Sequence, residues 1–354
     1  MRLRRAVESL LVTRLKAAHG VVLGKLRMHE LGCGDTTVNP VYGPTLNPHN
    51  VTHTVGGSSG GNGAALAARA ASVTLCGDSG GSCRNPASST GTVGFRPSTG
   101  CFATGVGAIR MSSFRDTVGV MGRAVSDAVL MNGLLSDCPT AAPPAALAGM
   151  RIGVLANFWR DLGDEAAPVL EAALARLEAA GAVLVRIDAA PLMELYHSSL
   201  GDPLFYAHEL PRDLAAYLAT HNYSTSLTDF VTAVATPSVR AWLRSFLHGG
   251  EDLTAAYYDA IETRVPALRA AWAALFDANR VAVLAVPTLP LPARPISDIE
   301  PMIDLNGRRE FYYDVMGRAL MADCVAGIPS ISLPAGVTEA HGPYPAGMPL
   351  GLLL

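Results

Sequence analysis

Lysine is nearly absent from this sequence. Lys16 and Lys25 are the only two among 354 residues, so arginine supplies almost all of the 27 basic residues that face 30 acidic ones. The net charge of -3 leaves no surplus of positive charge to neutralise a phosphate backbone, and the arginines are scattered rather than clustered. We therefore expect no nucleic acid among the partners of this protein.

Long apolar runs are also missing. Segments such as residues 281–286 end at prolines or charges well short of the roughly 20 residues that a spanning helix needs. With 49% hydrophobic and 16% charged residues, the chain nevertheless has ample material for a large buried core. We expect a globular protein with no membrane span.

The cysteines form no C-x-x-C pair and follow no regular spacing. They are Cys33, Cys76, Cys83, Cys101, Cys138 and Cys324. This pattern argues against a zinc site and against a disulfide framework, so we expect reduced thiols. His29 and Glu30 resemble a metal pair, but adjacent side chains point to different faces. Reduced thiols favour a cytoplasmic location, and the arginine-rich opening leaves organelle targeting as an open alternative.

Helical and strand-like segments alternate along the chain. Residues 8–18 predict a helix that stops at Gly20, and residues 21–23 (VVL) then predict a buried strand. Residues 150–155, 164–180 and 182–188 follow in the order strand, helix, strand. This order is a βαβ unit, which predicts an α/β fold with parallel pairing.

The stretch from about residue 195 to 275 is mostly helical, with aromatic and charged faces. Residues 281–286 then return to a strand pattern. We interpret the helical stretch as an insertion that covers the sheet.

Residues 56–105 are unusually rich in Gly, Ser and Thr. Residues 56–63 (GGSSGGNG) precede an Ala-rich helix expected at 64–71, and residues 77–82 (GDSGGS) form a second loop. Glycines let backbone amides turn toward one point, where a serine can react and its oxyanion be stabilised. The first loop alone is equally compatible with a linker or a helix-entry turn, and it lacks the lysine of a phosphate-binding loop. The two loops together indicate acyl transfer.

A rival interpretation makes Ser79 the nucleophile. Residues 77–81 (GDSGG) match the nucleophile loop of trypsin-like proteases, and the sequence around His19 echoes their histidine motif. Such a protease requires an all-β double barrel, whereas this sequence is Ala-rich and strongly helical. His19 also falls at the end of a predicted helix, where a polar residue serves as a cap. The protease remains a minor alternative.

The whole run from residue 56 to 97 resembles the signature of the amidase-signature family of serine hydrolases. The separation between Ser58 and Ser82 is the one that the family uses between its two catalytic serines. Blocks at 21–31, 115–119, 287–290 and 322–334 are similar to other family segments. The resemblance predicts one domain over residues 8–354, with residues 1–7 as an uncertain extension. Details of blocks 95–97, 115–117 and 333–336 most resemble indoleacetamide and mandelamide hydrolases.

The resemblance implies a fold, a reaction and a set of residues. The fold is a mixed β-sheet covered by helices on both faces, and the reaction hydrolyses a small-molecule carboxylic amide without cofactor or metal. Ser82 is implied as nucleophile and Ser58 as bridging serine after a cis Gly57–Ser58 bond. The remaining implied site residues are the oxyanion-hole residues Ser79, Gly80 and Gly81, with the Ser82 amide, and the supporting residues Asp78, Arg84 and Ser59. A homodimer is compatible with the resemblance.

The catalytic lysine of the family has no counterpart in this sequence. That residue lies upstream of the segment that contains Lys25, and Lys25 itself matches a non-catalytic family lysine. We therefore expect a chain truncated at both ends. Two hypotheses follow: a working amidase in which Lys25 or another group acts as base, and a non-catalytic remnant that at most binds an amide or acid.

Several aromatic residues are candidates for an acyl pocket. They are Trp242, Phe246, Tyr312 and Tyr313. Because Trp242 and Phe246 have helical spacing, core packing is the safer expectation for these two. Cys83, directly after Ser82, is expected to pack rather than to react.

Overall fold

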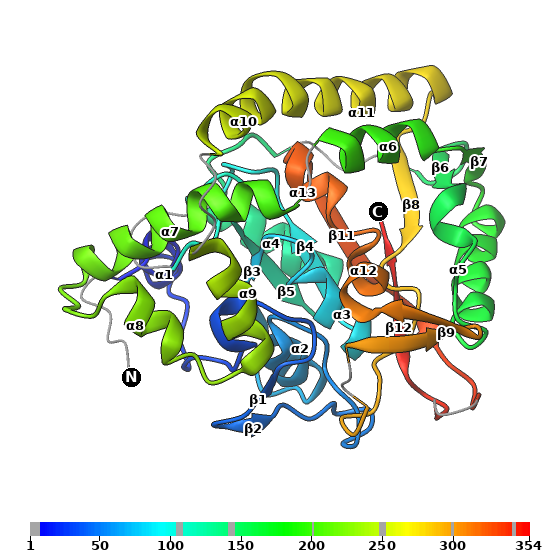
Figure 1. Cartoon of the computed structure of the whole chain (residues 1–354). Helices are drawn as coiled ribbons and strands as arrows, with labels where there is room; N and C mark the ends of the chain where they lie inside the picture. The colour runs from blue at the N-terminus through cyan, green and yellow to red at the C-terminus, as the bar shows by residue number, and fades with distance from the viewer. Residues whose placement is uncertain are drawn as a thin grey trace.

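A mixed sheet of eight strands forms the centre of the protein. The computed structural model describes residues 8–103, 109–140, 146–199, 202–247, 253–298, 301–341 and 345–354. The strand order is β3-β5-β4-β11-β12-β8-β6-β7 (Figure 1). These strands are β3 (Val73–Asp78), β4 (Val93–Arg96), β5 (Thr117–Gly122), β6 (Arg151–Leu155), β7 (Val183–Ile187), β8 (Val283–Pro287), β11 (Ser330–Val337) and β12 (Pro349–Leu353). The pairs from β3 to β8 are antiparallel, and β6 pairs parallel with both β7 and β8.

Two small antiparallel pairs lie outside this sheet. They are β1 (Val38–Asn39) with β2 (Gly43–Pro44), and β9 (Met302–Leu305) with β10 (Arg308–Phe311). The predicted βαβ unit is confirmed, because β6, α5 (Ala167–Ala179) and β7 follow in order and Arg151 pairs with Val183.

Helices cover both faces of the sheet, as the α/β prediction requires. Along β8, Leu284 and Val286 enter one core and the intervening Ala285 enters another, since successive side chains of a strand point to opposite faces. The first core includes Leu268 and Trp272 of α11 (Val265–Asn279), and the second includes Leu170 of α5. Figure 1 shows α11 and α6 (Ala190–Ser199) above the sheet and α5 beside β7.

The stretch predicted to be a helical insertion consists mainly of helices, and its being an insertion stays a prediction. Its helices, besides α6 and α11, are α7 (Asp202–Thr220), α8 (Leu227–Thr232), α9 (Pro237–Leu247) and α10 (Thr254–Asp259). The shorter helices elsewhere are α1 (Leu10–Ala17), α2 (Gly60–Ala67), α3 (Arg84–Thr90), α4 (Val125–Leu135), α12 (Tyr312–Gly317) and α13 (Ala322–Ala326). The predicted helix at 64–71 begins earlier than expected, because Gly60 and the residues after it already belong to α2.

The strand predicted at residues 21–23 is wrong. Val21 and Leu23 are 83% and 77% exposed, and neither belongs to a strand. The apolar pattern predicts a buried strand, but a strand also needs a partner for its backbone groups. The edge strand β3 pairs on its inner side with β5, and no described strand pairs with residues 21–23.

The prediction of reduced cysteines is also wrong for four of them. Cys76 bonds to Cys83 and Cys101 bonds to Cys138. Cys33 and Cys324 are free thiols. The pairs formed because the chain brings β3 against the loop before α3, and the end of α4 against the segment after β4. Cys83 therefore cross-links as well as packs.

The helices were compared with the length and hydropathy that a membrane-spanning helix requires. No helix within the described ranges has the length and apolar character needed to cross a bilayer.

Leu170→Ala tests how much α5 stabilises the sheet. Leu170 is fully buried against the second core, so we expect the free energy of unfolding to fall by about 2–5 kcal/mol. The measurement is urea unfolding followed by circular dichroism. Glu171→Ala, on the exposed side of the same helix, is the control and should change stability by less than about 0.5 kcal/mol. Equal losses in the two variants would contradict this role of α5.

Candidate active site

The two glycine-rich loops bring Ser58 and Ser82 to one place. The backbone N–H of Ser59 donates to the carbonyl oxygen of Ser82 at 3.2 Å. The carbonyl oxygen of Ser58 accepts from the N–H of His29 at 2.8 Å, and the hydroxyl of Thr37 donates to it at 3.3 Å. The Gly57–Ser58 peptide bond is cis, as the resemblance implied. Ser58 is buried, whereas Ser82 is half-buried and lines a cavity.

Some residues of the second loop line the cavity, whereas the backbone amides of two residues donate to Asp78. Ser79, Gly80 and Ser82 line the cavity. The N–H of Gly81 instead donates to Asp78 Oδ1 at 2.7 Å, and the N–H of Cys83 donates to Asp78 Oδ2 at 3.1 Å. The Gly81 amide is thus engaged with Asp78 in this structure, and the expected oxyanion hole of Ser79, Gly80 and Gly81 stays a prediction. Gly81 has φ +103°, and a Cβ there would collide with Leu320, so glycine is required.

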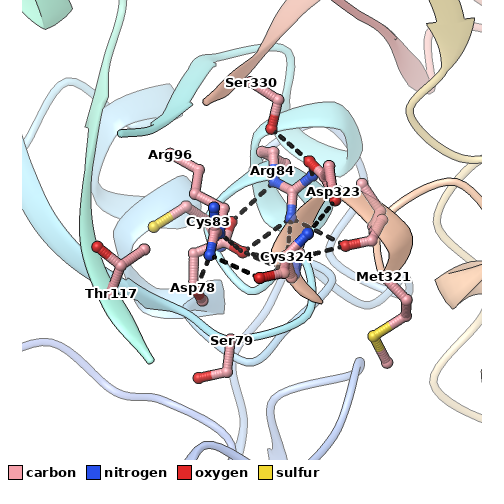
Figure 2. Close-up of polar contacts among 12 residues, drawn as sticks. Asp78, Ser79, Cys83, Arg84, Arg96, Thr117, Met321, Asp323, Cys324 and Ser330 are labelled. Carbon is pink, nitrogen blue, oxygen red and sulfur yellow. Dashed lines mark hydrogen bonds and ion pairs between the residues drawn. The ribbon is translucent and has the colours of Figure 1, made fainter. Parts of the chain in front are cut away.

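Arg84 anchors the second loop from inside the protein. Its Nη2 lies 2.9 Å from Asp78 Oδ1 and its Nε donates to Asp78 Oδ2 at 3.0 Å, while Nη1 lies 2.6 Å from Asp323 Oδ2. Figure 2 shows the guanidinium between the two carboxylates, with Ser330 donating to Asp323 from the far side at 2.7 Å. Arg84 and Asp78 are completely buried. The predicted supporting roles of Asp78 and Arg84 therefore correspond to a buried ion cluster, which we call the Arg84 cluster (Asp78, Arg84, Asp323).

The charges of this cluster stabilise one another. Burial on its own raises the pKa of Asp78, but the Arg84 guanidinium outweighs it and holds that pKa below the ordinary value. For Arg84, burial favours the neutral form, yet Asp323 and Asp78 raise its pKa well above the ordinary value. The neighbouring Cys324 thiol has a pKa raised to about 12, chiefly by burial, so it stays protonated. Asp78 and Arg84 therefore keep their charges at neutral pH.

A third set of contacts holds Ser79. Its hydroxyl donates to Asp116 Oδ1 at 2.5 Å, and Nη2 of Arg115 donates to its carbonyl oxygen at 2.9 Å. The Ser79 hydroxyl is therefore a structural donor. The protease alternative fails on the fold as well, because the mixed eight-stranded sheet is not a double β-barrel.

Glu209 of α7 connects the helical stretch to this region. It is fully buried and accepts hydrogen bonds from the hydroxyls of Ser112, Ser113 and Tyr257, the last at 2.6 Å. The Ser112 hydroxyl oxygen in turn accepts from the N–H of Arg115 at 3.1 Å. The helical stretch thereby contacts the residue that holds Ser79.

A cavity of about 340 Å³ opens beside Ser82. Its aromatic lining residues are Tyr206, Trp242, Phe246, Phe311 and Tyr313. The ring of Trp242 lies edge-on to Tyr206 at 4.9 Å and to Phe246 at 4.8 Å between centroids. Trp242 and Phe246 pack against a core cluster, as expected, and they also line the cavity, so α7 and α9 present this apolar wall to it.

For Tyr312 and Asn85 the structure differs from the prediction made from the sequence. Tyr313 lines the cavity as predicted, but Tyr312 does not; it is buried with the Arg294 guanidinium 3.8 Å from its ring centroid. Asn85 lines the cavity and accepts from the N–H of Gly57 at 3.3 Å, a role that sequence reasoning missed. Its place three residues after Ser82, inside the signature, was the available signal.

Neither lysine reaches this cavity. Lys16 pairs with Glu8 at 2.5 Å on the surface, and Lys25 is exposed. His29 and Glu30 indeed point apart: His29 Nδ1 accepts from the N–H of Thr37, and Glu30 caps the N–H groups of residues 235 and 236. Within the described residues, no group of three or more His, Cys, Asp or Glu side chains is arranged to hold a metal ion.

The mixed sheet and the paired serine loops are those of an amidase-signature protein, and the chain belongs to the Amidase family, whose model matches residues 3–354. It is an amidase acting on amides. An indoleacetamide hydrolase of Allorhizobium ampelinum is 30% identical over 99% of this chain and 74% of its own. A mandelamide hydrolase of Pseudomonas putida is 30% identical over 96% of this chain and 66% of its own. The crystal structure of an amidase aligns with a TM-score of 0.80 and 28% identity over 98% of this chain and 73% of its own.

These matches confirm the family and the fold. The family match runs through almost the whole chain, and the prediction of truncation at both ends is not borne out.

Arg84→Met should lower the free energy of unfolding by an amount that depends on pH. In Arg84→Met, Asp323 stays buried without this cation and Asp78 keeps only Arg96, 3.6 Å away, so we expect a loss of about 3–5 kcal/mol at neutral pH. The depressed pKa of Asp78 contributes stability above its unfolded pKa of about 3.9, and this contribution is lost as pH falls through the lower folded pKa.

The variant's penalty should therefore shrink toward pH 4, because carboxylates that have lost Arg84 can take up protons. Chemical unfolding of both proteins across this pH range measures it, with the exposed substitution Arg186→Met as control. A penalty that does not vary with pH would contradict the ionic origin of the stabilisation.

Glu209→Gln should weaken the link between α7 and the Ser112 segment. The amide keeps one acceptor oxygen where the carboxylate offered two, so we expect destabilisation of about 1–3 kcal/mol. A double-mutant cycle with Ser112→Ala, monitored by thermal unfolding, should give a coupling of about 0.5–3 kcal/mol. Additive effects of the two substitutions would show that the contact between Glu209 and Ser112 contributes nothing to the free energy of unfolding.

Proposed function

We propose that this amidase cleaves its substrate through an acyl-enzyme on Ser82, with Ser58 as the proton relay. The main support is that Ser82 lines the cavity together with Ser79 and Gly80, while the Ser58 loop is hydrogen-bonded directly to the Ser82 backbone. The Ser79 contacts and the Arg84 cluster hold that loop in place. Acyl transfer needs such a preorganised arrangement.

The proposed reaction proceeds in two halves. Ser82 Oγ attacks the amide carbonyl carbon and gives its proton to Ser58, which passes its own proton on toward the leaving nitrogen. The amides of Ser79, Gly80 and Ser82 stabilise the oxyanion, because that of Gly81 already donates to Asp78. The C–N bond then breaks, and the leaving nitrogen takes up the proton that Ser58 passed on. Water attacks the acyl-enzyme by the same route and releases the acid and free Ser82.

The proposed substrate is a small aromatic amide. Tyr206, Trp242 and Phe246 form an apolar wall that fits an aromatic acyl group. The names of the relatives, indoleacetamide and mandelamide hydrolases, agree with a substrate of this class.

A binding protein without turnover is the second candidate. It is favoured by one observation, that neither Lys16 nor Lys25 lines the cavity, so neither is positioned to take the relay proton. In that case the serines and the loop amides would only bind an amide or its acid.

Labelling with a fluorophosphonate probe separates the two candidates. We expect labelling of the folded chain that disappears in Ser82→Ala and slows by roughly a hundredfold or more in Ser58→Ala, because the relay is lost. The exposed substitution Ser126→Ala is the matched control and should label normally. Absence of labelling in a folded chain would overturn the acyl-enzyme proposal and favour the binding protein.

A further inference from the structure

Asp35 is a carboxylate inside the reaction cavity. It lies on the wall that residues 32–35 contribute, and it is the only charged side chain among the described residues lining the cavity. No described residue donates a hydrogen bond to its carboxyl group. The side chain is half-buried, so it is partly withdrawn from water, and a ligand in the cavity can supply it with a donor.

The backbone fixes Asp35 beside the Ser58 loop. A Cβ added to Gly57 would lie 2.9 Å from the Cα of Asp35, so the two chain segments are in direct contact. Two residues further on, the Thr37 hydroxyl donates to the carbonyl oxygen of Gly56 at 2.8 Å and to that of Ser58. Asp35 therefore has a defined position relative to the reacting serines.

The charged and titratable groups near Asp35 are Arg294, Tyr313 and Cys33. Burial raises the pKa of Asp35 to about 7, and the Arg294 guanidinium offsets only part of that effect. The pKa of Tyr313 is raised to about 12 by burial and then by Asp35, and burial also raises that of Cys33, so both stay neutral. Arg294 itself stacks on Tyr312. Asp35 is thus the group of the cavity wall whose charge changes near neutral pH.

We propose that Asp35 is a specificity-determining residue that binds a protonated amine on the substrate. The proposal rests on the proposed function, since it takes the aromatic wall as the site of the acyl group. A substrate amine would donate a charge-assisted hydrogen bond to Asp35, and the faces of the cavity's aromatic rings also attract a cation. The preferred substrate is then an aromatic amide that carries an amine substituent in addition to its scissile amide.

Equilibrium binding tests this proposal without requiring turnover. The full chain with Ser82→Ala is titrated calorimetrically with phenylacetamides that carry an aminomethyl group at the ortho, meta or para position. Each is compared with its ethyl analogue, which has the same size but no charge. We expect at least one amine to bind roughly tenfold more tightly than its ethyl analogue at about pH 8. This preference should diminish at about pH 6, where Asp35 becomes protonated.

Asp35→Asn should remove the preference while leaving the affinity for the ethyl analogues unchanged. Asp277→Asn, an exposed carboxylate on α11, is the matched control and should keep it. Equal binding of amine and ethyl compounds overturns the role of Asp35 but leaves the acyl-enzyme proposal intact. A preference for amines that persists in Asp35→Asn, or that does not change between the two pH values, also overturns it. The fluorophosphonate experiment reports on Ser82 independently, so the two proposals can fail separately.

Discussion

The architecture of the site depends on a buried cation, Arg84, which bridges two carboxylates. One guanidinium contacts Asp78 through two nitrogens and Asp323 through the third. Asp78 belongs to the end of β3, whereas Asp323 lies in α13, far along the chain. A planar guanidinium suits this position because it offers several donors in fixed directions and stays charged when buried. The cluster thus joins the signature loops to a segment that the sequence places more than two hundred residues away.

Asp78 transmits that constraint to the loop that contains Ser82. Its two oxygens accept the N–H groups of Gly81 and Cys83, which flank Ser82 in the sequence. The position of the serine is therefore set by a carboxylate that itself never reaches the cavity. From the opposite side, Arg115 contacts Ser79 and lies 5.0 Å from the ring of Tyr206. The residues that hold the loop and the residues that form the aromatic wall are in direct contact.

The sequence predicted those features that depend on local spacing. Two serine loops, the βαβ unit and the helical stretch were all recognisable from residue patterns. Features created by contacts between distant segments were not: neither disulfide was foreseen, because irregular spacing carries no information on which cysteines meet in space. Trp242 and Phe246 have the helical spacing of core residues, and only the packing of α9 against α7 shows that a cavity lies beside them. Residues 21–23 show the opposite error, since apolar composition alone does not provide a strand partner.

Asp35 illustrates why part of a site escapes sequence reasoning. It sits in a stretch of Gly, Cys and Thr that resembles an ordinary turn, and nothing nearby in the sequence marks it. Its significance arises only when residues 34–35 pack on Gly57 and Asp35 becomes part of the cavity lining. Burial and the absence of a donor are properties of that three-dimensional setting.

The bond between Cys76 and Cys83 has a consequence for the unfolded chain. The two cysteines are seven positions apart and enclose Asp78, Ser79, Gly80, Gly81 and Ser82 in a small covalent ring. A ring of this size restricts the conformations of the enclosed residues even when every tertiary contact is gone. The segment that carries Ser82 therefore never becomes a fully free coil as long as the two sulfurs stay joined. Part of the entropy that a glycine-rich loop would otherwise lose on folding has already been removed by one covalent bond.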